Sequence, residues 1–128
     1  MIEIGVSPGS SDLRRARRAL RDRLAVTHVE SAHVSAVEVV ANELLGAALE
    51  NGRPGRIVLR VEVFARLTSV RVRCSSDVEL RDEPFGVRER VIEGLAFAWG
   101  KRGAPDGSID LWAELARPLS SSGSAPPG

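Results

Sequence analysis

The sequence has few residues that form disulfides or bind metals: its 128 residues include one cysteine, Cys74, and two histidines, His28 and His33. A single thiol cannot form an internal disulfide or supply a cysteine-based zinc site, and two histidines leave few other ligands. A chain of this length buries about two-thirds of the surface that its unfolded form exposes, so it folds without such supports. We therefore predict one domain without a metal site.

Long apolar runs and an excess of one charge are also missing. No run approaches the ~18 apolar residues of a membrane-spanning helix, and Met1 to Gly5 lack the pattern of a signal or transit segment. The 18 basic and 17 acidic residues give a formal net charge of +1. This balance does not predict a nucleic acid or a membrane as partner. We expect a cytoplasmic protein.

Two helices are indicated by apolar residues that recur every three or four positions. The first begins at residues 10–12, which can cap a helix, and runs to about Leu24. The second runs from near Ser31 to Asn51–Gly52, where glycine suits a left-handed cap. The outer side of the first helix could contact nucleic acid or an acidic protein, and a solvated face is the usual explanation. This side carries Arg14, Arg17, Arg18 and Arg21.

Alternating apolar and polar residues predict strands, and a third helix is expected over residues 91–99 with one interruption at Gly94. The order of elements predicts an α+β fold: a two-layer sandwich of a mostly antiparallel sheet with three helices on one face. We expect residues 1–116 to form this domain and residues 117–128, rich in serine, glycine and proline, to be a disordered tail. The predicted strands cover residues 2–6, 57–64, 70–74 and 109–115.

Three stretches of the chain share their arrangement with one known family. They are the arginine-rich residues 14–20, the helix over residues 39–52, and the closing residues 94–100 with 109–115. Together they resemble the anti-sigma-factor serine kinases and related regulators of the GHKL (histidine-kinase-like) ATPase superfamily. The likeness covers about residues 8–116. It implies the histidine kinase-like ATPase fold, with ATP and Mg²⁺ as cofactors.

In that family a helix glutamate is the general base, and an asparagine four residues later holds Mg²⁺. The resemblance assigns Glu43 to the first position and Ala47 to the second. Residues four apart lie on one face of a helix, so both side chains can reach one phosphate-metal centre. Ala47 has no oxygen for a hard cation. Asn42 lies about 140° around the helix from Ala47, so it cannot take the place of the missing asparagine. Asn51 lies on the same side as Ala47, but a capping role explains it as well as metal binding does.

The glycine motifs of the family are also incomplete in this chain. Ser76 stands at the position of the adenine-binding aspartate, and Asp77 follows one residue late, which in an extended segment points its carboxylate to the opposite side. Gly86 begins the next motif, whose second glycine is Arg88. The nucleotide-binding candidates are therefore Ser76, Asp77 and Gly86. A loop aspartate and a turn or helix-start glycine are the other interpretations of Asp77 and Gly86.

Arg88 could bind phosphate, but the carboxylates near it in sequence would repel a triphosphate. These departures predict a regulatory protein that acts by protein contact, with a degraded ATP site and little or no phosphotransfer. By resemblance its partners are a sigma factor, an anti-sigma antagonist protein or a second copy of itself. Two alternatives remain open: an active Mg-ATP-dependent protein serine kinase with Glu43 as base, and a dimerising structural module.

Overall fold

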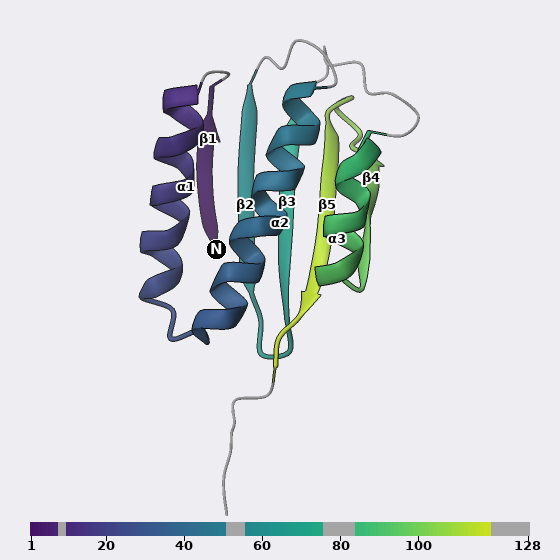
Figure 1. Ribbon diagram of the computed structural model, residues 1–128. Helices are drawn as coiled ribbons and strands as arrows, with labels where there is room; N and C mark the ends of the chain where they lie inside the picture. Colours follow the sequence, from purple (N-terminus) through teal and green to yellow (C-terminus); the bar gives the residue numbers. More distant parts are fainter. Residues whose placement is uncertain (8–9, 51–55, 76–83, 119–128) are drawn as a thin grey trace, which may run out of the picture.

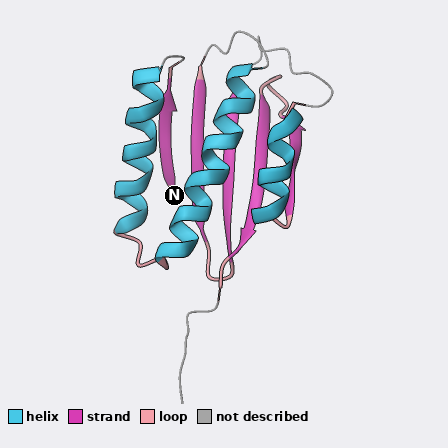
Figure 2. Ribbon diagram, viewed as in Figure 1, coloured by secondary structure: helices cyan, strands magenta, loops and turns pink. Residues whose placement is uncertain are grey.

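The computed structural model describes residues 1–7, 10–50, 56–75 and 84–118 (Figure 1). In chain order the elements are β1 (Ile2–Val6), α1 (Ser10–Ala25), α2 (Ser31–Glu50), β2 (Ile57–Val63), β3 (Leu67–Cys74), the 3₁₀ turn η1 (Gly86–Arg88), α3 (Glu89–Leu95), β4 (Ala98–Gly103) and β5 (Ile109–Ala116). The strands form one sheet in the order β1-β2-β3-β5-β4, with every neighbouring pair antiparallel. All three α-helices lie on one face of it (Figure 2). The predicted α+β two-layer sandwich is confirmed.

Strand alternation determines which side chains enter the layer between sheet and helices. Ile4, Leu59, Val72 and Leu111 pair across four neighbouring strands, and all four are buried. The residues between them point to the opposite face of the sheet, because the side-chain period of a strand is two. Cys74 belongs to the buried set, and burial raises the pKa of its thiol to about 11. The prediction that Cys74 is a small core residue is confirmed.

Helix α2 contributes the largest share of the helical side of the core. Among the described helices it alone is long and apolar enough to cross a membrane. One side of α2 is buried, and the helix packs against the sheet and α1. The buried residues of α2 are His33, Val37, Val40, Ala41, Leu44, Leu45, Ala47 and Ala48.

The third helix is shorter than predicted, and the prediction of helix through Trp99 is wrong. The backbone N–H of Ala96 makes the last helical bond to Ile92, and Ala96 itself is extended. Phe97 then donates its N–H to the carbonyl of Glu114 at 3.0 Å, and β4 follows along β5. The apolar residues after Gly94 fit a helix or a strand equally well in so short a run. Because these residues pair with β5, they form a strand.

Residues at the ends of predicted elements have different outcomes. Gly52, the predicted helix cap, lies outside the described residues, as do residues 119–128 of the predicted tail. Arg117, which the sequence assigned to that tail, is held by the domain. Its N–H donates to the carbonyl of Arg66 at 2.8 Å, and its guanidinium donates to the carbonyl of Phe64 at 3.1 Å. The ordered chain therefore continues at least one residue past β5.

Candidate functional site

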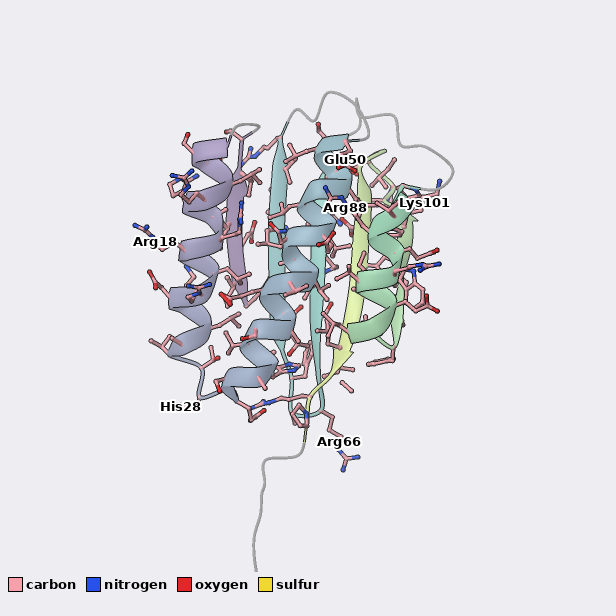
Figure 3. All side chains as sticks on the ribbon, viewed as in Figure 1. Arg18, His28, Glu50, Arg66, Arg88 and Lys101 are labelled. Atoms are coloured by element: carbon pink, nitrogen blue, oxygen red, sulfur yellow. The ribbon has the colours of Figure 1, made fainter. Side chains whose placement is uncertain are left out.

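The glutamate assigned as a base by resemblance lies in a group of charged side chains between α2 and η1. Glu43 and Glu50 are two turns apart on the same face of α2. The Arg88 guanidinium lies against both: Nη1 is 2.8 Å from Glu43 Oε1, and Nη2 is 2.6 Å from Glu50 Oε2. Arg88 Nε also donates to Glu50 Oε1 at 3.2 Å. We call these three residues the Arg88 cluster; Figure 3 shows Glu50 and Arg88 near the C-terminal end of α2.

Gly46 allows the guanidinium to lie flat against the helix. It sits one turn after Glu43, between the two carboxylates. A β-carbon at position 46 would overlap the guanidinium atoms of Arg88. The absence of a side chain at Gly46 therefore gives the guanidinium its present place, and a β-carbon there would make the end of the Arg88 side chain move.

Hydrogen bonds within the Arg88 cluster favour the charged form of Arg88. The bond to Glu50 is the largest cause that raises the pKa of Arg88; partial burial lowers that pKa, and the bond to Glu43 raises it again. The side chains of Glu43 and Arg88 are 17% and 23% exposed, so water screens their attraction only in part. With two carboxylates and one guanidinium, the cluster has a formal charge of −1.

The described residues offer few ligands to a magnesium-triphosphate. A general base needs a free lone pair directed at the proton that it removes, and Oε1 of Glu43 already accepts a hydrogen bond from Arg88. Ala47 is fully buried and offers no side-chain oxygen. Asn42 borders the cluster: it lines one hollow together with Gly46, Glu50 and Arg88. Across the described part of the chain, no three His, Cys, Asp or Glu side chains form a group that could hold a metal ion.

Of the three nucleotide-binding candidates, one lies within the part of the chain that the structure describes. Ser76 and Asp77 lie outside the described residues. Gly86 is described: it begins η1 with a φ of +53°, a backbone conformation that favours glycine. It lines a hollow of about 330 Å³ whose described walls come from residues 84–89 and from β4, including Trp99 and Lys101. Gly86 therefore starts a helical turn beside β4.

Sequence reasoning missed the composition of the Arg88 cluster. It considered Arg88 only as a phosphate ligand and gave no role to Gly46 or Glu50. The available signal was the spacing of Glu43, Gly46 and Glu50, which places two carboxylates beside a bare stretch of helix that can receive a cation. Nothing in that spacing indicates which distant arginine supplies the cation.

Replacing Gly46 by alanine tests whether the guanidinium lies where the structure places it. Alanine stabilises an exposed helix position by about 0.5–1 kcal/mol relative to glycine. At position 46 this gain is offset, because Arg88 must move and its bond to Glu43 is lost. We expect Gly46→Ala to leave the free energy of unfolding unchanged or lower, as measured by urea denaturation.

Gly94→Ala is the matched control, since Gly94 is an exposed residue of α3 and a β-carbon added there would meet nothing within 4 Å. It should show the full helix-propensity gain of about 0.5–1 kcal/mol. Equal stabilisation by both substitutions would show that Arg88 does not rest on Gly46.

Comparison with known proteins adds no assignment to the Arg88 cluster. No model of a protein family matches the chain, and no curated protein is similar to it in sequence. The role of the cluster is therefore argued from its geometry.

Proposed function

We propose that this protein is a regulator of the anti-sigma-factor kinase-like kind, which acts by protein contact and transfers no phosphate. The observation that carries the proposal is the 2.8 Å ion pair between Glu43 and Arg88. In the family that the sequence resembles, that glutamate must accept a proton. Here its carboxylate is held by a permanent cation. The glutamate at the position of the family's general base is therefore part of an ion pair.

The cation of the Arg88 cluster is not available to a nucleotide either. Arg88 makes three hydrogen bonds to the carboxylates of Glu43 and Glu50. A triphosphate would have to replace these bonds and would then face two uncompensated carboxylates. Like charges a few ångströms apart repel by about 1 kcal/mol in water and by several kcal/mol at lower effective dielectric. These costs argue against the alternative of an active Mg-ATP-dependent kinase.

A protein-contact role is supported by an exposed apolar stripe along η1 and α3. Val87, Val91 and Leu95 recur every fourth residue, so they share one side of the helix. Their exposed fractions are 91%, 40% and 40%, and Phe97, just past the helix, is 58% exposed. Contiguous exposed apolar side chains of this kind mark contact surfaces in soluble proteins. By resemblance, the partner would be a sigma factor, an anti-sigma antagonist or a second copy of the chain.

Calorimetric titration with Mg-ATP tests the proposal. We expect no binding heat at millimolar nucleotide and no upward shift in melting temperature. The melting temperature is a sensitive measure of binding, because a ligand present at a hundred times its dissociation constant stabilises a folded protein by about 2.7 kcal/mol. Micromolar affinity for Mg-ATP, or transfer of its terminal phosphate to a serine of any added protein, would refute the proposal.

A further inference from the structure

Positive charge is concentrated on α1. The helix contains six arginines and two aspartates, a net charge of +4, although the whole chain carries only +1. Like charges one turn apart destabilise a helix. The arginines are Arg14, Arg15, Arg17, Arg18, Arg21 and Arg23, and the aspartates are Asp12 and Asp22.

Three of these arginines have structural roles inside the domain. Arg23 donates to the carbonyl of Glu3 at 2.9 Å and so covers the open edge of β1. Arg15 pairs with Asp12 at the start of α1. Arg21 pairs with Glu38 of α2 at 2.7 Å and joins the two helices. These contacts account for one half of the arginines on α1.

The other half, Arg14, Arg17 and Arg18, make no ion pair with any residue that the structure describes. All three are exposed. Together with Arg21 they form the lining, within the described part of the chain, of a surface hollow of about 220 Å³. Arg18 extends into solvent in Figure 3. These arginines thus give one exposed place on α1 that attracts an anion.

A second hollow lies beside this arginine-lined hollow. It occupies about 230 Å³ between α1 and α2, and it is lined by Leu13, Leu45 and Leu49 together with Asn42, Gly46, Glu50 and Arg88. Leu13 directly precedes Arg14 and is one helical turn before Arg17, so the two hollows adjoin on α1. The two charged residues of this lining, Glu50 and Arg88, are bound to each other.

We infer that this surface of α1 and α2 docks an acidic protein segment that carries one apolar anchor residue. Carboxylates of the segment pair with Arg14, Arg17 and Arg18, and the anchor enters the leucine-lined hollow. A nucleic acid would match the arginines but not the leucines. The inference rests on the proposed protein-contact function. Its test uses no nucleotide, so either proposal can fail without the other.

The test measures fluorescence anisotropy of a labelled synthetic peptide of about five helical turns, built from glutamates with a single leucine. A second peptide has serine in place of that leucine, and a single-stranded DNA oligomer has the same net charge. The full chain should bind the first peptide at least about tenfold more tightly than the other two, with affinity that falls as salt is raised.

Charge-reversing variants locate the binding surface. Arg14→Glu with Arg17→Glu and Arg18→Glu should weaken binding of the glutamate-leucine peptide at least about tenfold. The control reverses three exposed arginines elsewhere, Arg56, Arg66 and Arg90, and should weaken it less than about threefold. Circular dichroism checks that both variants fold, and the single Arg17→Glu change serves if the triple variant does not.

Four results would overturn the inference: no binding of the glutamate-leucine peptide, equal binding of the serine peptide, binding of the DNA oligomer as tight as that of the peptide, or equal losses in the two triple variants. The third would assign the surface to nucleic acid. The fourth would mean that net charge alone drives association.

Discussion

Replacing Leu44 by alanine is expected to lower the free energy of unfolding by about 2–5 kcal/mol. Leu44 is fully buried on the side of α2 that packs against the sheet. The substitution removes apolar surface from the core and leaves a cavity that a close-packed interior fills only in part. Glu43 is the preceding residue of the same helix, so the core contact of Leu44 also holds the Arg88 cluster in position.

Urea denaturation measures this loss, and the dependence on urea concentration should not change if only the folded core is affected. Val39→Ala is the matched control, because Val39 lies on the same helix but is 41% exposed. Its effect should stay within about 0.5 kcal/mol. A Leu44→Ala loss as small as that of the control would show that α2 is not anchored by this side chain.

The second large effect is a fall in stability as the pH drops below about 6.5, the ordinary pKa of histidine. His33 is buried at the start of α2, and its Nε2 lies 2.7 Å from Thr68 Oγ1 of β3. Burial is the main cause that lowers the pKa of His33 in the folded protein; Glu30 raises that pKa and Arg117 lowers it. These are the charged groups that face His33 from the α1–α2 connection and from the end of β5.

The direction follows from proton binding in the two states. Below pH 6.5 the unfolded chain binds a proton at His33 that the folded protein resists, so folding loses stability with falling pH. The loss ends once the pH is below the lowered pKa of the folded state. One such group contributes at most about 1.4 kcal/mol per pH unit. The measurement is a set of urea denaturation curves between about pH 7 and pH 5. This interval lies above the pH range in which most carboxylates titrate.

Two variants assign this pH dependence to one residue. His33→Gln keeps a side chain that can reach Thr68 and removes the titrating group, so its stability should be nearly independent of pH in this range. His28→Asn is the control: His28 is exposed, and asparagine tolerates its φ of +57°. If the pH dependence disappears in His28→Asn and persists in His33→Gln, the assignment to the buried histidine is wrong.

Local patterns in the sequence were sufficient to predict most of the helices and strands. The three-and-four spacing of apolar residues placed α1 and α2, and period-two alternation placed β2, β3 and β5, because these repeats match the geometry of helix and strand. They failed after Gly94, where a short apolar run fits both. There the bond between Phe97 and Glu114 selects the strand. That bond joins residues far apart in the chain, and no local repeat contains it.

The candidate site divides in the same way. Helical spacing alone places Glu43 and Glu50 on one side of α2, and the sequence puts an alanine, which has no side-chain oxygen, at position 47. The sequence does not determine which cation lies between the two carboxylates. Many arginines could serve, and only the packing of η1 against α2 brings Arg88 to within 2.8 Å of Glu43. Long-range contacts decide such pairs because folding, rather than chain proximity, sets the distance between their side chains.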